Sequence, residues 1–364
     1  MAIPVIHVGC GPFSTQRLQL IIDEGLFTPV ACVDIDRQVV ESCISSLRGN
    51  VPVNLDKRIY KTIAEAKQDN EEAQACFIFA SATAHAELIM ESLSLGMHTF
   101  CVKTIACNQE EFSSIIAVKQ SNEELMLVQG LNNQWNEASA KMQEWLRGES
   151  GIGRMLGGEC LCWGRQNLKA TPPQPDSRVE GMYFHALACH QLGQLVAAIG
   201  MPDYVTAYTH QRVEKELDFL GIWGTAGGQC LFEFPDGVPF SYVGTRAGHG
   251  NPFGFASRWS GQWTIHGDRG DLRREGGRLT LFRGGQSVED YFLKDLDNGL
   301  IEDERLQFRA FYDAVTVGTN KQWMQDTSLN TWVLMEACNL SARNMEKVSV
   351  QELKLSLFGT NNNE

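Results

Sequence analysis

The chain opens with an apolar segment, Ile3–Val8, that leads directly into a glycine turn, Gly9-Cys10-Gly11, and then into a helical pattern over Ser14–Glu24. Glycines between a strand and a helix allow a tight turn and let the backbone approach a ligand closely. An acidic residue, Asp34, follows the next apolar segment about 20 residues further on. This order predicts a strand–turn–helix–strand unit, and it favours a dinucleotide-binding turn over a purely structural one.

Short apolar strands continue to alternate with helical patterns as far as residue 131. Further strands are predicted at Val30–Ile35, Ala75–Ala80, Thr99–Lys103 and Leu125–Leu131, and helices at Arg37–Leu47, Thr62–Gln68, Ala84–Leu95 and Gln109–Gln120. Such alternation is typical of a doubly wound parallel sheet. We therefore expect residues 1–131 to form an α/β domain of the Rossmann type.

The pattern changes after Leu131, where helices combine with strands joined by short turns. The predicted segments are a helix at Gln134–Leu146, a strand at Gly153–Trp163, a proline-rich loop at Lys169–Arg178, a helix at Gly181–Gly200, strands around a Pro235-Asp236-Gly237 turn, two more strands within Gly261–Phe282, and helices at Glu304–Val317 and Thr331–Asn344. Turn signals between β-prone runs indicate antiparallel pairing. We expect residues 132–364 to form an α+β domain with a large, mostly antiparallel sheet, open on one face, for substrate binding and oligomerisation.

Composition excludes several classes of protein. The formal net charge of −13 argues against nucleic-acid binding, which needs a basic surface. No segment reaches the roughly 20 apolar residues of a membrane span, and signal-peptide features are lacking. The 11 cysteines include no CxxC pair, which indicates reduced thiols, a cytoplasmic location and no metal site. Cys10 is interpreted as a small filler beside the turn.

The residues of the glycine turn have different expected roles. Gly9 allows the tight turn, Gly11 lets backbone approach a pyrophosphate, and Ser14 is small enough for close helix–strand packing. The N–H groups at the helix start then face the phosphates. Asp34 would accept hydrogen bonds from the ribose and repel a 2′-phosphate, which favours NAD, while the nearby Arg37 keeps NADP as an alternative.

Several later motifs resemble the Gfo/Idh/MocA family of NAD(P)-dependent oxidoreductases along essentially the whole chain. The matching segments are HAELIMESLSLGMHTFCVKTIA (85–106), GLNNQW (130–135), GMYFHALACH (181–190), WTIHGDRGDL (263–272) and LQFRAFYDAVTVG (306–318). The chain departs from the family pattern at three places. Val102-Lys103-Thr104 stands where the family has Glu-Lys-Pro, Ala186 where it often has an aspartate, and Ala80-Ser81 where it often has Thr-Pro.

The resemblance implies a set of cofactor-binding residues at the carboxyl ends of the first strands. They are Gly9, Gly11, Pro12, Phe13, Ser14, Asp34, Ile35, Ser81, His85 and Lys103. It also implies two catalytic residues, Lys103 and His190. Lys103 would hydrogen-bond the reacting oxygen at a strand end, where ligands bind in open α/β sheets. His190 would exchange the substrate proton as a general acid or base.

Substrate contacts are expected from four further residues. Helical periodicity places Tyr183 and Gln194 on the face of His190, whereas His185, five residues away, lies over a third of a turn round the helix. Trp163 and Arg165, together with Arg178, flank the proline-rich loop and could form a lid with a cationic handle, or the loop could simply be solvated.

The resemblance favours an oxidoreductase that uses NAD, with NADP as the alternative, on a sugar, cyclitol or related hydroxy or keto compound at a cleft between the domains. The other hypothesis is an NAD(P)-binding sensor without turnover, because Ala186 and Val102 replace motif residues. A sheet with one open face commonly pairs with another, so we expect a homodimer or higher homo-oligomer. A small-molecule substrate is the other expected partner, with neither nucleic acid nor membrane.

Overall fold

The computed structural model describes residues 2–163, 183–211, 225–245, 261–275, 277–292 and 299–359. These residues form two compact units. Unit 1 comprises the chain up to Gly130, Arg305–Leu329 and the C-terminal segment that begins at Leu357, and unit 2 comprises Leu131–Glu304 and Asn330–Ser356. The predicted division into domains 1–131 and 132–364 stays a prediction. The two compact units differ from these domains because two C-terminal segments belong to unit 1.

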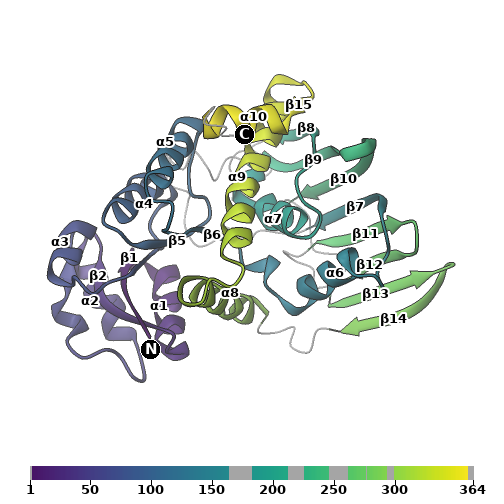
Figure 1. Ribbon diagram of the computed structural model, residues 1–364. Helices are drawn as coiled ribbons and strands as arrows, with labels where there is room; N and C mark the ends of the chain where they lie inside the picture. Colours follow the sequence, from purple (N-terminus) through teal and green to yellow (C-terminus); the bar gives the residue numbers. More distant parts are fainter. Residues whose placement is uncertain are drawn as a thin grey trace, which may run out of the picture. The chain divides into compact units, whose positions relative to one another are not determined.

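Unit 1 is built on six parallel strands in the order β3-β2-β1-β4-β5-β6 (Figure 1). The strands are β1 (Ile3–Val8), β2 (Phe27–Val33), β3 (Ile59–Tyr60), β4 (Ala75–Ile78), β5 (His98–Val102) and β6 (Leu127–Gly130). Their helices are α1 (Pro12–Glu24), α2 (Arg37–Ser46), α3 (Ile63–Asp69), α4 (His85–Ser94) and α5 (Gln109–Gln120), with short 3₁₀ turns η1 (Leu55–Lys57) and η2 (Ala82–Ala84). All four residues of β4 are buried, which explains a continuously apolar strand. The predicted Rossmann sheet is confirmed.

Helix α8 (Gly299–Thr316) adds an aromatic layer to this sheet from Arg305 onward. The ring of Phe308 meets that of Phe77 edge-on at a centroid distance of 5.4 Å, and Phe311 meets Phe77 in the same way at 5.7 Å. Edge-to-face pairs of this kind stabilise a core beyond the area that they bury. The sheet of unit 1 therefore needs a helix from the C-terminal third of the chain.

Unit 2 is built on nine strands in the order β14-β13-β12-β11-β7-β10-β9-β8-β15. The strands are β7 (Met155–Trp163), β8 (Tyr204–Gln211), β9 (Thr225–Phe234), β10 (Val238–Thr245), β11 (Gln262–Gly267), β12 (Asp271–Glu275), β13 (Arg278–Arg283), β14 (Gln286–Phe292) and β15 (Val348–Ser349). The β7–β10 pair is parallel and the other pairs are antiparallel. The mostly antiparallel sheet is confirmed, and the predicted turn lies between β9 and β10 as η6 (Pro235–Gly237).

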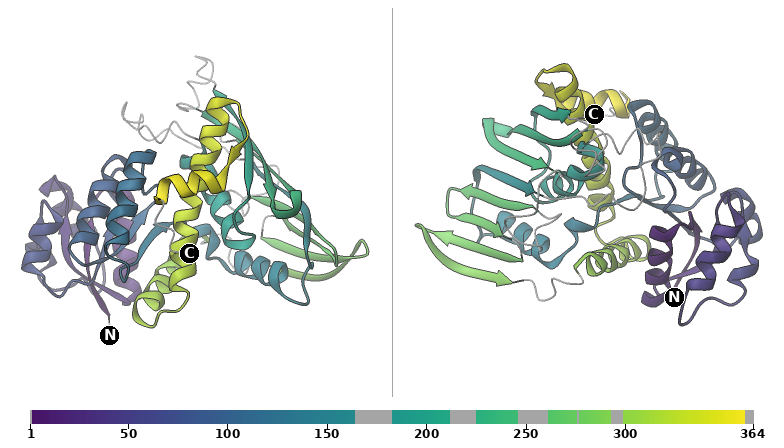
Figure 2. Two further views of the ribbon diagram at one scale, coloured as in Figure 1. Left: turned by 45° about the horizontal axis from the view of Figure 1, so that its top comes forward. Right: turned by 180° about the vertical axis from the view of Figure 1, so that it is seen from behind.

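Among the described residues of unit 2, α6 and α7 lie on one face of this sheet (Figure 2). The helical elements are η3 (Asn132–Gln134), α6 (Glu137–Arg147), a π-helical turn η4 (Phe184–Ala188), α7 (Cys189–Ala198), and the unit 2 parts of α9 (Lys321–Asn344) and α10 (Val350–Phe358). None of the described helices of either unit is long and apolar enough to cross a membrane.

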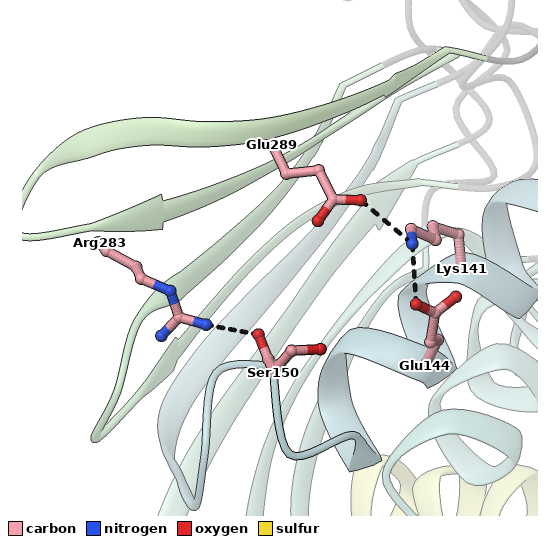
Figure 3. Close-up of polar contacts among 5 residues, drawn as sticks. All are labelled: Lys141, Glu144, Ser150, Arg283 and Glu289. Atoms are coloured by element: carbon pink, nitrogen blue, oxygen red, sulfur yellow. Dashed lines mark hydrogen bonds and ion pairs between the residues drawn. The ribbon is translucent and has the colours of Figure 1, made fainter.

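An ion pair fastens α6 to the edge of the sheet (Figure 3). The Nζ atom of Lys141 lies 3.2 Å from a carboxylate oxygen of Glu289 on β14 and 2.8 Å from one of Glu144. On the neighbouring strand β13, Arg283 donates to the backbone oxygen of Ser150. These contacts hold the α6 segment and the β13–β14 hairpin together.

Candidate functional site

The glycine turn lies between β1 and α1 and leaves no room for a side chain at its first position. Gly9 has φ +83°, and a Cβ atom there would lie 2.7 Å from Ala80 N and 2.8 Å from the Phe79 carbonyl. Gly11, the N-cap of α1, has open space instead, because no atom lies within 4 Å of a Cβ built on it. Only glycine fits the first position, and the second leaves the start of the helix accessible.

The first turn of α1 presents backbone N–H groups at this open side. Gly11 makes no side-chain cap bond, and Pro12 occupies the first helical position. The first turn of a helix has N–H groups without intrahelical acceptors, and these groups attract anions. The predicted cofactor residue Phe13 is half exposed, and the guanidinium carbon of Arg17 lies 3.6 Å from its ring centroid.

Ser14 holds the turn from inside through its hydroxyl group. The Oγ atom donates to Gly9 O and lies 2.7 Å from Nε2 of His7 on β1. Burial lowers the pKa of His7 to about 3, so its ring is neutral at physiological pH. Because the hydroxyl donates its proton to Gly9, it accepts from His7. The sequence predicted a small side chain here but did not reveal this buried bond.

Asp34, which follows β2, binds the glycine turn directly. One carboxylate oxygen accepts from Cys10 N at 2.9 Å, and the other accepts from Asp36 N at 3.1 Å. A carboxylate oxygen has two lone pairs, so each can also accept from a further donor. The next side chain, Ile35, is 89% exposed. Asp34 is therefore fixed at the sheet edge with acceptor capacity left for a ligand.

His85 lies buried beneath the same edge, at the start of α4. Its Nδ1 atom lies 2.7 Å from Thr104 O, and its Nε2 atom lies 3.0 Å from Ala80 O. Burial lowers the pKa of His85. The ring thus connects the ends of β4 and β5, and its contact with a cofactor stays a prediction, as does that of the exposed Ser81.

Lys103 comes directly after β5 and is half-buried. The peptide bond that follows it, Lys103–Thr104, is cis. Thr104 is buried, and Ile105 N donates to the Gln129 side chain at 3.1 Å. In the strand order, β2, β1, β4 and β5 are neighbours. Their carboxyl ends therefore bring Asp34, the glycine turn and Lys103 to one edge of the sheet, as predicted for ligand binding.

His190 is the second residue of α7 and follows the π-helical turn η4. A π-helical turn bonds residue i to i+5, so one more residue enters the turn than in an α-helix. The α-helical spacing used above for Tyr183 and His185 therefore does not apply across this segment. Because π turns depend on tertiary packing rather than on a residue pattern, the sequence offered no signal for one.

The two side chains expected on the His190 face are bound to the core of unit 2. Tyr183 is buried, and its hydroxyl lies 2.8 Å from that of Tyr242. Gln194 is also buried, and its oxygen accepts from Arg274 at 2.9 Å. Their contact with substrate stays a prediction.

Trp163 ends β7 and is 37% exposed. Arg165, Arg178 and the proline-rich loop lie outside the described residues, and so does the predicted lid. Within the described ranges, no group of three His, Cys, Asp or Glu side chains is arranged to hold a metal ion.

Two buried residues near the predicted ones were missed by the sequence analysis, His7 and Arg274. Arg274 did carry a signal, because it follows Leu272 by two residues in a strand and so shares its buried face. An arginine at an inward-facing position is rare unless it is paired.

Comparison with known proteins identifies relatives of the fold. No protein-family model and no curated protein matches the sequence. Among solved structures, an oxidoreductase from Agrobacterium radiobacter in complex with NAD⁺, L-tartaric acid and magnesium is 18% identical, with a TM-score of 0.79 over 97% of this chain and 100% of that one. An oxidoreductase from Thermotoga maritima is 18% identical, with a TM-score of 0.76 over 97% and 100%.

A levoglucosan dehydrogenase in complex with NADH and levoglucosan is 15% identical, with a TM-score of 0.75 over 96% of this chain and 100% of that one. All three likenesses extend over nearly the whole length of both chains. They confirm the predicted fold, a Rossmann sheet combined with a second, mostly antiparallel sheet.

Proposed function

We propose that this chain is an NAD-dependent oxidoreductase that acts on a sugar, a cyclitol or a related hydroxy or keto compound. The observation that carries the proposal is the edge of the unit 1 sheet, where the glycine turn, Asp34 and Lys103 lie together. Two similar structures support it, since one contains NAD⁺ with L-tartaric acid and the other NADH with levoglucosan.

The residues of the turn fit a dinucleotide by their chemistry. The open side of Gly11 and the N–H groups that begin α1 suit a pyrophosphate, and the Asp34 carboxylate suits ribose hydroxyls. Bound NAD would supply the hydride acceptor or donor. The protein must then bind the substrate oxygen and move its proton.

Lys103 and His190 would divide this work. The Lys103 ammonium would hydrogen-bond the reacting oxygen and stabilise negative charge that develops on it. The His190 imidazole would exchange the hydroxyl proton, because it is the side chain whose ordinary titration range lies near neutral pH.

The surroundings of Asp34 favour NAD over NADP. A 2′-phosphate would meet the negative charges of Asp34 and Asp36. Arg37, the nearest candidate to bind it, points its Nε atom at Glu41 at 2.8 Å. This ion pair is exposed and therefore weak. Even so, the carboxylates of Asp34, Asp36 and Glu41 outnumber the one arginine, so the local charge disfavours a 2′-phosphate.

The decisive experiment is a turnover assay combined with a binding titration. Purified protein is mixed with NAD or NADP and with panels of sugars, polyols, cyclitols and hydroxy acids, and NADH formation is followed by absorbance. Turnover with one compound class supports the enzyme and identifies its substrate class. NAD binding without turnover on any panel would favour the sensor hypothesis instead.

We also propose a homodimer through the open face of the nine-stranded sheet. Tyr208, Leu231 and Trp163 are 52%, 56% and 37% exposed, and strand register places them on the same face. Exposed apolar side chains grouped on one surface are typical of protein interfaces. A cytoplasmic location is proposed as well, since all eleven cysteines are buried thiols.

A further inference from the structure

A buried arginine on β12 joins the sheet of unit 2 to the helix that carries His190. Arg274 has no exposed surface. Its Nη1 atom donates to Gln194 Oε1 on α7 at 2.9 Å and to Ser139 Oγ on α6 at 3.2 Å. One guanidinium group therefore contacts two helices and the sheet beneath them.

This contact determines how the Gln194 amide is oriented. A guanidinium group only donates hydrogen bonds, so the amide must turn its oxygen toward Arg274. Ser139 Oγ lies 3.2 Å from the same oxygen and shares its one proton between it and Asn133 O, which is 2.7 Å away. The amide nitrogen must then point the other way, where Nε2 donates to the backbone oxygen of His190 at 3.1 Å.

The hydrogen bond to His190 lies where the helix changes its geometry. The π-helical turn ends at Ala188, and α7 begins at Cys189. A shift of this boundary by one residue would rotate the following side chains by about a quarter of a turn or more. A side-chain donor on the His190 carbonyl favours the register in which that carbonyl faces Gln194.

The charge of Arg274 is supported by its electrostatic surroundings. Burial lowers the pKa of Arg274 to about 10, so the group keeps its positive charge at neutral pH. Asp303 on α8 is the nearby acid, and its Oδ2 atom accepts from Asn136 Nδ2 at 3.2 Å. Asn136 also caps α6, since its Oδ1 atom accepts from Ser139 N at 2.7 Å.

We propose that Arg274 and Gln194 are positioning residues for His190, acting through the amide of Gln194 on the helix turn that directs the imidazole. The inference rests on the proposed function, in which His190 exchanges the substrate proton. Neither residue touches the substrate in this role. Arg274 orients the amide, and the amide holds the carbonyl of His190.

The test compares Arg274→Met, Gln194→Met and the double variant with Arg274→Lys and with Arg273→Met. Arg274→Lys keeps a charged donor for the Gln194 oxygen. Arg273 is the matched control, because it is the neighbouring residue on β12 but is exposed and pairs with Glu275. The first readout is the NMR titration of the His190 imidazole, identified by its loss in His190→Gln, which requires no turnover.

We expect both methionine variants to change the His190 resonances and to shift its pKa by about half a unit or more. Their kcat should fall about tenfold or more while KM changes less than about twofold, because misplacement acts on the chemical step. The kcat of the double variant should fall no further than that of either single variant. Arg274→Lys should keep most of the wild-type kcat and His190 titration, and Arg273→Met should change neither.

The proposal is overturned if the His190 titration is unchanged in both methionine variants, or if Arg273→Met changes it equally. If Arg274→Met does not fold, Gln194→Met alone decides, since it removes the donor to His190 with a side chain of similar length. A wild-type protein without turnover would reject the proposed function but leave the NMR comparison valid.

Discussion

Asp34 accepts two backbone hydrogen bonds, from Cys10 N and Asp36 N, and these bonds determine what Asp34→Ser should do. In the proposed function, the variant loses the acceptor for the ribose hydroxyls and the negative charge that would repel a 2′-phosphate. We expect affinity for NAD to fall about 10- to 100-fold, the range for hydrogen bonds to a charged group, and discrimination against NADP to weaken. Calorimetric titration with both cofactors measures these changes.

The matched variant for this prediction is Glu41→Gln, which removes the ion-pair partner of Arg37 and leaves Asp34 in place. It should leave NAD affinity unchanged and increase NADP affinity at most slightly. Unchanged affinities for both cofactors in Asp34→Ser would exclude the ribose role.

Lys103 and His190 can be tested separately from cofactor binding. Lys103→Ala and His190→Ala should each lower turnover about 100-fold or more, because in the proposed function each removes a group that would bind the reacting oxygen or exchange its proton. NAD affinity, measured by titration, should stay nearly constant in both variants. A variant with full activity would remove its residue from the mechanism.

His7 makes stability depend on acid pH. Its pKa is about 3 in the folded protein, against 6.5 ordinarily, so the unfolded chain binds a proton that the folded chain does not. The contribution of neutral His7 to the free energy of unfolding is complete above about pH 6.5 and is lost as the pH falls toward 3. When the pH falls from about 7 to about 4, the unfolding free energy of both proteins should fall. The fall should be about 3 kcal/mol smaller for His7→Asn than for the wild type.

Urea unfolding at several pH values measures that difference. His266→Asn is the control, because the side chain of His266 is 58% exposed and pairs only at the surface with Asp271. Parallel pH profiles for the wild type and His7→Asn would show that His7 has the same pKa in the folded and the unfolded protein, which would contradict the lowered pKa.

At the scale of elements, the two glycines of the turn should affect different properties, Gly9 the stability of the fold and Gly11 the binding of NAD. Gly9→Ala should destabilise the protein by about 1–3 kcal/mol through its positive φ alone, with more from the collision at Phe79 and Ala80. Gly11→Ala should leave stability nearly unchanged, since its Cβ meets open space, but should weaken NAD binding by obstructing the pyrophosphate. Thermal unfolding and NAD titration of both variants measure the two effects, and equal loss of stability in both would contradict them.

Elements with a strong local pattern could be predicted, and those that depend on distant contacts could not. The strand β4 is apolar throughout because both faces are buried, so the sequence alone identified it. The two-residue strand β3 (Ile59–Tyr60) has no such pattern and exists through pairing with β2. The π turn η4 was likewise missed, and with it the true geometry around His190.

The same distinction applies to the candidate site. The tight turn at Gly9 and the place of Asp34 beside it could be predicted, because a strand–turn–helix unit needs these residue types at these spacings, while the binding of a cofactor by Gly11 and Asp34 stays a prediction. The buried partners His7 and Arg274 act through hydrogen bonds to Ser14 and Gln194. Such bonds join residues that only the folded chain brings together.

At the scale of the whole molecule, the open sheet face predicts the state of assembly. Leu231 lies on β9, which has a neighbouring strand on each side in the nine-stranded sheet, and its register partner on β10 is Ser241. If two such faces meet, Leu231→Arg places a charge in the interface and should raise the dissociation constant about tenfold or more. Sedimentation velocity at micromolar concentration should show a dimer for the wild type and a shift toward monomer for Leu231→Arg.

The control for this prediction is Val317→Arg, which changes an equally apolar side chain that is 72% exposed in unit 1. It should sediment as the wild type does, because it lies outside the proposed interface. A general effect of surface charge on association would instead act at either position. Dissociation by Leu231→Arg alone would assign the interface to the open sheet. A monomeric wild type, or a dimer that Leu231→Arg leaves intact, would exclude that face and leave its exposed apolar residues without a role in self-association.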